Sequence, residues 1–283
     1  MSKHAASDSS RISPTAHYTA QVWFRYGMSH PALETRLGRR LHAALAPANL
    51  VYKLSGRPNL DEMLLARHRS IDFLLEREIA AGRVSQVIEV AAGLSPRGLT
   101  FTRQHPELRY IEADLPDMAA HKRRALERAG KGRDHHVVEI DALTDDGPAS
   151  IAALAARHLD PARGTAIVTE GLISYFARDQ VEGMWRRFAR TLRGFPHGVY
   201  FSDLNTAGDV SGLHTAKAFR RVLQIFARGQ VYLHYGAPDE AAAALEAAGF
   251  DRATIHRPND LSEVDFPGRG KRHVVRVIEA RVG

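Results

Sequence analysis

Four acidic side chains each follow a short apolar or β-branched run, which is where an open α/β sheet places its ligand-binding groups. They stand in the segments 89–97 (EVAAGLSPR), 110–116 (YIEADLP), 139–143 (EIDAL) and 169–176 (TEGLISYF). A carboxylate has two acceptor oxygens and can therefore hold both hydroxyl groups of a ribose. The pattern predicts a nucleoside-containing ligand along the carboxyl edge of a parallel sheet.

The first segment turns on the small residues Ala91, Ala92 and Gly93, which let a backbone approach a ligand closely. Only Gly93 is a glycine, so the segment lacks the G-x-G-x-x-G fingerprint, and an ordinary strand-to-helix turn is the alternative. Asp114 lies roughly twenty residues further on, where an acidic residue commonly holds a ribose. This spacing favours the ribose role for Asp114 over that of a surface acid or a helix cap.

The third and fourth segments supply one further carboxylate each. Asp141 can accept a hydrogen bond from the exocyclic amine of adenine, and a helix-capping role is the alternative. Glu170 ends the central strand and faces the place where chemistry would occur. A buried carboxylate there is costly unless it meets a cation, and a sulfonium with its α-ammonium group would be such a partner. Tyr175 is the best candidate for a substrate contact, with core packing as the alternative.

Four blocks in this order resemble the leucine carboxyl methyltransferase family, which includes O-methyltransferases of polyketide biosynthesis. The blocks are 67–72 (RHRSID), 91–97 (AAGLSPR), 110–116 with Lys122 after it, and 169–176, and the resemblance spans roughly residues 18–200. It implies a class I S-adenosylmethionine (SAM) fold, with SAM as cofactor and S-adenosylhomocysteine (SAH) as product. The family usually shows G-A-G-x-D-T-R, so Ala91 adds a methyl group to the turn and Ser95 removes an acid.

The resemblance also implies a role for each matched residue. Arg67 would bind the methionine carboxylate of SAM, and Glu170 and Gly171 would lie near the methionine moiety. The remaining residues expected to bind the cofactor are Glu89, Ala91 and Gly93 at the turn, Asp114 and Leu115 at the ribose, and Asp141 and Ala142 at the adenine.

Methyl transfer from a sulfonium needs mainly orientation and desolvation, because the methyl group is already activated. A carboxylate acceptor is ionised at neutral pH and needs no general base, whereas a phenol usually does. We therefore expect a carboxylate, or else a hydroxyl, on a small acidic and polyketide-like metabolite. A protein C-terminal carboxylate is the alternative. Tyr175 and Glu170 are the candidate catalytic residues, and the expected substrate contacts are Tyr18, Arg25, Tyr26, Tyr175, His214 and Tyr235.

The elements that must position these residues alternate in type after residue 82. Strands are expected at 85–90, 108–113, 137–140, 165–169 and 198–203, with amphipathic helices between them. Two last strands, 250–257 and 273–282, follow a helix and must pair antiparallel. This order predicts the α/β, Rossmann-like seven-stranded sheet of a SAM methyltransferase. We expect a disordered arm at 1–15, a helical cap at 16–82 with Asn59 as an N-cap, and a methyltransferase domain at 83–283 with a lid insertion at about 205–235.

Composition narrows the remaining function classes. The 283 residues contain no cysteine, which excludes disulfides, thiolate metal sites and a cysteine nucleophile, and the 15 histidines form no metal-binding motif. No apolar run reaches the ~20 residues that span a bilayer, so we expect a cytoplasmic protein. Because the histidines form no metal-binding motif, we also expect no bound metal. The net charge is +7, and the lysine and arginine residues are interspersed with acidic residues along the sequence. Nucleic-acid binding is therefore a less favoured alternative. A non-catalytic SAM fold is a second, less favoured alternative. Helices within 30–80 could form a homodimer.

Overall fold

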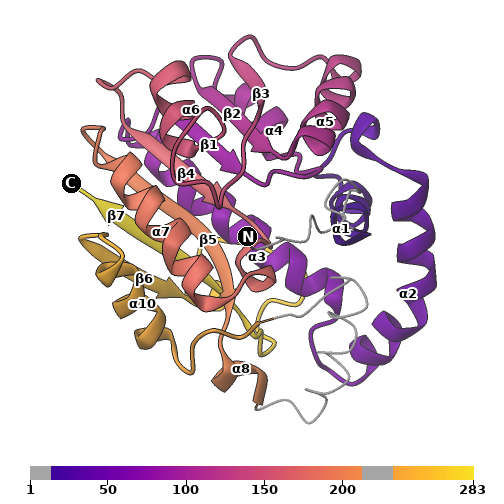
Figure 1. Ribbon diagram of the computed structural model, residues 1–283. Coiled ribbons are helices and arrows are strands. Elements are labelled where there is room, and N and C mark those ends of the chain that lie inside the picture. The colour runs from indigo at the N-terminus through magenta and orange to yellow at the C-terminus, as the bar shows by residue number, and fades with distance from the viewer. Residues whose placement is uncertain (1–13, 212–231) are drawn as a thin grey trace, which may run out of the picture.

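The computed structural model describes residues 14–211 and 232–283 and contains one seven-stranded sheet (Figure 1). The strand order is β3-β2-β1-β4-β5-β7-β6, and β7 runs antiparallel to both of its neighbours. The strands are β1 (Gln86–Val90), β2 (Arg109–Asp114), β3 (His135–Glu139), β4 (Thr165–Thr169), β5 (Gly198–Asn205), β6 (Arg252–His256) and β7 (Val275–Val282). This order confirms the predicted fold.

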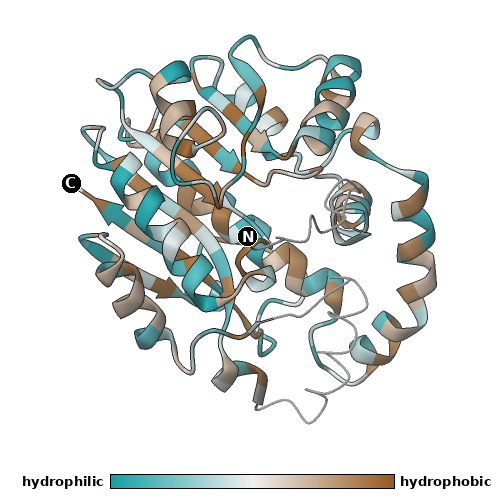
Figure 2. Cartoon of the chain, in the orientation of Figure 1, coloured by the Kyte–Doolittle hydropathy of each residue, from teal (hydrophilic) through white to brown (hydrophobic). Residues whose placement is uncertain are grey.

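Helices cover both faces of the sheet, as the right-handed crossover rule requires. One face packs against α3 (Leu60–Ala80), α4 (Arg97–Gln104) and α5 (Pro116–Ala129). The other face packs against α6 (Ile151–His158), α7 (Arg178–Leu192) and α10 (Pro238–Ala247). Because both faces are covered, every residue of β1 and β4 is buried, and Figure 2 shows polar residues beside apolar ones in the sheet. In β1, Val87 faces the first layer and Ile88 the second.

The N-terminal segment forms helices, as predicted, and its first helix begins at Pro14 rather than at residue 16. These helices are α1 (Pro14–Arg25), the short 3-10 helix η1 (Pro31–Leu33), α2 (Arg36–Leu54) and α3. Asn59 caps α3 in a full capping box, because its side chain accepts from the Glu62 backbone while the Glu62 side chain accepts from the Asn59 backbone. The buried residues of α1, which include Tyr18 and Trp23, pack against α3 and α5.

The chain reverses its direction across the sheet between β1 and β4. It proceeds from β1 to β2 and β3 on one side, and β4 and β5 lie on the other. In open α/β sheets such a switch point, at the carboxyl ends of the strands, is where ligands bind. The segments 91–97 and 170–176, the latter with the 3-10 helix η2 (Ile173–Tyr175), both leave the sheet at this place.

The remaining short elements are α8 (Ala207–Ser211), which follows β5, and the 3-10 helix η3 (Pro258–Asp260), which follows β6. Residues 1–13 of the expected arm, and residues 212–231 of the expected lid insertion, lie outside the described residues. Within the described ranges, none of the helices combines the length and the hydrophobicity needed to cross a bilayer.

Candidate functional site

The turn after β1 is held tightly against the end of β2. Ala91 donates its backbone N–H to the carbonyl of Ala113 at 2.7 Å, and Gly93 donates to Oδ2 of Asp114 at 2.8 Å. Ala91 and Gly93 both adopt positive φ angles, 53° and 52°. An alanine in this region is strained by its Cβ, whereas glycine is not. The turn for which a cofactor contact was predicted is therefore strained at Ala91.

Asp114 lies at the end of β2, where a ribose-binding acid was predicted. Its Oδ1 accepts from the N–H of Leu115 at 2.8 Å, while Oδ2 is bound to Gly93. Each oxygen keeps a second lone pair for another donor. Burial raises the pKa of Asp114, and the two backbone donors and Lys122 oppose that rise. Leu115 is 39% exposed beside it and could cover one face of a ring.

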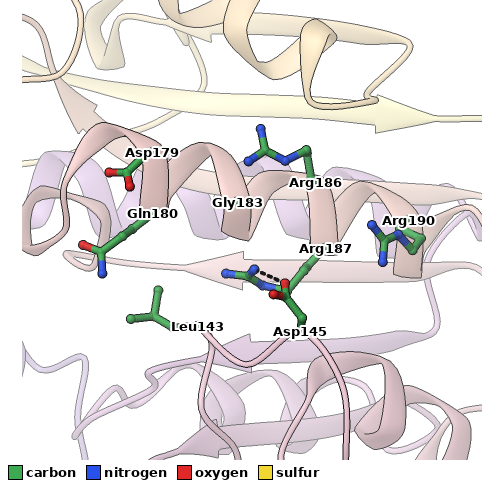
Figure 3. Close-up of a pocket in the computed structure, with 8 residues that line it drawn as sticks. All are labelled: Leu143, Asp145, Asp179, Gln180, Gly183, Arg186, Arg187 and Arg190. Atoms are coloured by element: carbon green, nitrogen blue, oxygen red, sulfur yellow. Dashed lines mark hydrogen bonds and ion pairs between the residues drawn. The ribbon is translucent and has the colours of Figure 1, made fainter. Parts of the chain in front are cut away.

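The loop after β3 places Asp141 and Ala142 at the same edge of the sheet. Oδ1 of Asp141 accepts from the backbone of Leu143 at 2.9 Å, so Asp141 shapes its own turn as the capping alternative foresaw. Arg187 of α7 donates from Nε to the carbonyl of Ala142 at 3.2 Å and pairs with Asp145 (Figure 3). The loop is thus fixed from the side of α7.

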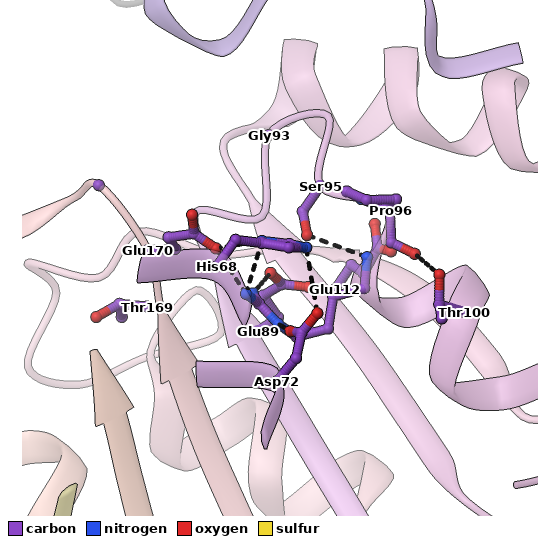
Figure 4. A network of polar contacts seen from close by, with 12 residues as sticks. His68, Asp72, Glu89, Gly93, Ser95, Pro96, Thr100, Glu112, Thr169 and Glu170 are labelled. Carbon is purple, nitrogen blue, oxygen red and sulfur yellow. Dashed lines mark hydrogen bonds and ion pairs between the residues drawn. The ribbon is translucent and has the colours of Figure 1, made fainter. Parts of the chain in front are cut away.

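Glu170 belongs to a buried polar network (Figure 4). Its Oε1 accepts from Nε of Arg67 at 2.9 Å, and its Oε2 lies 2.6 Å from Nη2 of Arg97 and 2.7 Å from Nδ1 of His68. Burial alone would raise the pKa of Glu170, but His68, Arg97 and Arg67 together hold this pKa well below its usual range. The sequence suggested that the cation facing Glu170 would come from the ligand, whereas the protein itself supplies the arginines that offset its charge.

Arg97, the first residue of α4, connects three elements and had no predicted role. The side chain is fully buried and donates to Asp72 of α3, to Glu89 of β1 and to Glu170, each at 2.5 or 2.6 Å. Tyr110 of β2 donates to the second oxygen of Glu89 at 2.8 Å. Both Arg97 and Asp72 stood inside the matched blocks, so their presence in the motif was the available signal.

Asp203 near the end of β5 is a second residue that the sequence reasoning missed. It accepts from Nη1 of Arg67 at 3.3 Å and from the N–H of Gly171 at 2.6 Å. Gly171 has a φ of 66°, and a Cβ there would lie 2.9 Å from Nη2 of Arg67, so the close packing requires glycine. An acid near the end of a central strand was the signal for Asp203, by the same rule that selected Glu170.

Lys122 supports the turn from α5. Its ammonium group donates to the carbonyl of Ser95 at 2.6 Å and reaches the carbonyl of Gly93 at 3.3 Å. It also pairs with Glu112 at 2.7 Å, and Glu112 in turn pairs with His135. These groups are buried, so the network is rigid and holds the turn where the sequence placed it.

Tyr175 and the start of α1 lie together above the sheet edge. The Tyr175 hydroxyl donates to Oγ1 of Thr15 at 3.2 Å, and a Cβ on Gly93 would lie 3.6 Å from the Cβ of Ala16. The first turn of α1 therefore lies between the β1 turn and η2. The aromatic part of α1 packs on the core, while its first turn covers the site.

Other expected substrate residues have different surroundings. Tyr18 is buried and donates to Asp61 at 2.6 Å among the N-terminal helices. Tyr235 is buried in the core, stacked on Trp185 at 5.7 Å. These two side chains are occupied elsewhere, so the substrate role predicted for them is not supported by their contacts. Arg25 and Tyr26 are exposed at the far end of α1, about 15 Å from Thr15 at 1.5 Å rise per residue. His214 lies outside the described residues.

Charges at the site favour a cationic ligand. The carboxylates of this edge outnumber the guanidinium groups of Arg67 and Arg97, even with His68 counted as a cation. They are Asp72, Glu89, Asp114, Glu170 and Asp203. Burial raises the pKa of Asp203, because a charged carboxylate is less stable away from water. SAM carries a sulfonium and an ammonium group against one carboxylate, so its charge fits this donor set. Among the described residues, no group of three or more potential ligands could hold a metal ion.

Known proteins are similar in sequence to parts of this chain. The family model for leucine carboxyl methyltransferase matches residues 32–189. A relative from Mycolicibacterium smegmatis, named "Putative S-adenosyl-L-methionine-dependent methyltransferase", is 36% identical over 122 residues. One from Streptomyces coelicolor with the same kind of name is 37% identical over 122 residues. Each alignment covers 42% of this chain, and 37% and 41% of the respective relative, so the chain spans about two fifths of the length of these curated relatives.

Solved structures show the same fold at low sequence identity. A structure from Thermobifida fusca, described as "a putative methyltransferase", has a TM-score of 0.64 at 16% identity and covers 99% of both chains. A DUF574 family protein from Streptomyces avermitilis has a TM-score of 0.64 at 14% identity and covers 96% of this chain and 100% of that one. PigF, solved with SAH, has a TM-score of 0.51 at 17% identity and covers 74% of this chain and 53% of that one. Because the family model matches more than half of the sequence, this chain belongs to the leucine carboxyl methyltransferase family.

Proposed function

We propose that this protein transfers a methyl group from SAM to an oxygen atom of a small organic molecule. The observation that carries the proposal is the array of buried carboxylates along the carboxyl ends of β1, β2, β4 and β5, which exceeds the local cations. An uncompensated negative charge in a buried site is unfavourable, and a cofactor of net positive charge relieves it. Family membership supports the same cofactor.

Each side chain of this array has a proposed role. Asp114 holds the ribose hydroxyls, and the turn at Gly93 carries the adjoining part of the cofactor. Arg67 binds the methionine carboxylate through Nη2, since its Nε and Nη1 are taken by Glu170 and Asp203. Among the described residues, none accepts a hydrogen bond from Nη2 of Arg67. Asp141 and the backbone of Ala142 lie where the adenine is expected.

Bound SAM supplies an already activated methyl group, so the protein needs to orient and to desolvate rather than to activate it. The first turn of α1, over the β1 turn, excludes water from the site. The acceptor lies on the side of Tyr175 and Asp203. Of the cations expected to hold an acidic acceptor, Arg25 is remote and His214 lies outside the described residues. The proposal therefore covers a carboxylate and a hydroxyl acceptor, with polyketide-like aromatic acids as the first candidates.

The test is a mass-spectrometric assay with SAM that carries a deuterated methyl group. The panel contains aromatic acids, phenols, amines and a peptide with a free C-terminal carboxylate. We expect labelled methyl on an oxygen of a small molecule, and mild alkaline hydrolysis then separates methyl esters from methyl ethers. The Arg67→Ala variant should lose the label on the same acceptor. Transfer to nitrogen alone, or to the peptide alone, would contradict the proposal.

A further inference from the structure

A groove with an estimated volume of about 410 Å³ lies between α7 and the loop after β3 (Figure 3). None of the residues proposed above to bind the cofactor lines it. Its size falls within the range of small-molecule sites. The lining residues are Leu143, Asp145, Asp179, Gln180, Gly183, Arg186, Arg187 and Arg190.

Gly183 forms a floor between two guanidinium groups of this groove. A Cβ on Gly183 would lie 3.5 Å from Nη1 of Arg187 and 3.8 Å from Nη2 of Arg186. Arg190 follows Arg186 after one helical turn and lines the same groove. Because Gly183 has no side chain, space is left between the guanidinium groups of Arg186 and Arg187, in the groove that Arg190 also lines.

The cations of this groove are incompletely neutralised. Arg187 pairs with Asp145, whereas neither Arg186 nor Arg190, both exposed, has an acidic partner in the part of the chain that the structure describes. Elsewhere on α7, Arg178 pairs with Glu182 and Glu240, and Arg193 at its end pairs with Asp251. Like charges one turn apart repel each other, so a bound anion would stabilise Arg186 and Arg190.

We propose that this groove binds a small organic phosphate, with its phosphate group over Gly183 between Arg186 and Arg187. The planar guanidinium group suits phosphate oxygens better than an ammonium group does, because it donates two parallel hydrogen bonds. The groove is larger than a phosphate ion and has the apolar side chain of Leu143 and the amide of Gln180 towards its other end. The body of the ligand lies there.

Occupancy of the groove also affects the loop after β3. Arg187 holds that loop through the carbonyl of Ala142 and through Asp145. A phosphate competes with Asp145 for Arg187 and loosens the loop, which weakens binding of an adenosyl ligand. Only this coupling rests on the proposed function, because phosphate binding between Arg186 and Arg187 does not require SAM.

The experiment titrates the whole protein with phenyl phosphate, inorganic phosphate and benzoate at constant low ionic strength, by calorimetry and phosphorus NMR. The test variant is Arg186→Gln/Arg190→Gln. The control is Arg36→Gln/Arg252→Gln, which removes the same charge from two other exposed arginines. We expect saturable binding that is tightest for phenyl phosphate. We expect a loss of about tenfold or more in the test variant and less than about twofold in the control.

Equal losses in the two variants would overturn the proposal, since net charge alone would then explain the binding. No saturable binding to the wild-type protein would overturn it as well. A third adverse result is displacement of phenyl phosphate by SAH together with normal affinity in the test variant, which would assign the phosphate to the cofactor site. Normal SAH binding with no effect of phenyl phosphate on it would remove the coupling alone.

Discussion

Ala91 is the single non-glycine residue with a positive φ among the residues that the structure describes. Its methyl group lies in the turn that the proposed cofactor must approach. Ala91→Gly should raise the free energy of unfolding by about 1 kcal/mol, because glycine adopts this conformation without a steric cost. It should also tighten SAM binding. Urea unfolding and calorimetric titration measure the two effects.

The control for this prediction is Ala92→Gly, one residue further along the same turn. Ala92 has no positive φ, so this change should lower stability through the greater freedom of glycine in the unfolded chain. If both variants change the free energy of unfolding in the same direction, backbone strain at Ala91 does not explain the effect of Ala91→Gly.

The proposed binding of the methionine carboxylate of SAM depends on Arg67. Arg67→Ala should weaken SAM binding by ~1.5–3 kcal/mol, the range for a hydrogen bond to a charged group. Methylthioadenosine lacks the methionine carboxylate, so its affinity should hardly change. Titration of both ligands therefore separates a lost contact from a damaged site. Equal losses for the two ligands, or no loss for SAM, would show that the carboxylate was placed wrongly. Arg69→Ala, on the same helix, is the matched control.

Individual side-chain partners were the part of the site that the sequence could least provide. The rule that strand ends carry ligand groups selected Asp114 and Glu170 correctly as residues of this edge. It could not show that Arg97 would reach Asp72, Glu89 and Glu170, because these contacts join segments far apart in the chain. The charge balance around Glu170 depends on that arrangement, so it emerged only from the structure.

At the scale of elements, α3 carries Arg67, His68 and Asp72 into the site, and its N-terminal cap fixes where it begins. Asn59→Ala should lower the free energy of unfolding by about 1 kcal/mol, since it removes the side-chain acceptor of the capping box. Asn59→Asp should retain most of that stability, because aspartate also caps well. Thermal and urea unfolding test the pair. An unchanged Asn59→Ala protein would show that packing alone holds this helix end.

Most elements could be predicted because their patterns are local. The strand at Thr165–Thr169 has the predicted bounds. The third strand begins at His135, two residues before its predicted start. His135 is buried because it pairs with Glu112 on the neighbouring strand, and this compensation is invisible in a hydrophobic pattern. The first helix also starts earlier than expected, at Pro14, a residue favoured in the first turn of a helix.

At the scale of the whole molecule, a second ionic network joins α3 to the C-terminal strand, away from the proposed site. Glu279 of β7 pairs with Arg77, His256 and Arg281, and Arg281 also pairs with Glu78. Burial alone would raise the pKa of Glu279, but His256 and Arg281 lower this pKa to about 2. A carboxyl group with a lowered pKa stabilises the fold above its unfolded-state pKa near 4.3, and this stability is lost as the pH falls towards 2.

This network predicts how stability depends on acid. The free energy of unfolding of the wild-type protein should fall steeply as the pH drops from about 4.3 to about 2. Glu279→Gln should be less stable at neutral pH and should show a shallower fall in that window. Glu263→Gln, at an exposed position, should behave like the wild type. Parallel curves for all three proteins would mean that Glu279 contributes nothing to acid sensitivity.

The carboxylate-rich edge of the sheet is proposed to bind an adenosyl cofactor. Calorimetric titration with SAM and SAH, with NAD as control and Asp114→Asn as the comparison variant, tests it most directly. We expect micromolar binding of both adenosyl ligands, no binding of NAD, and a marked loss in the variant. No binding of SAM or SAH to the wild-type protein would contradict it, and the fold would then be a scaffold for another function.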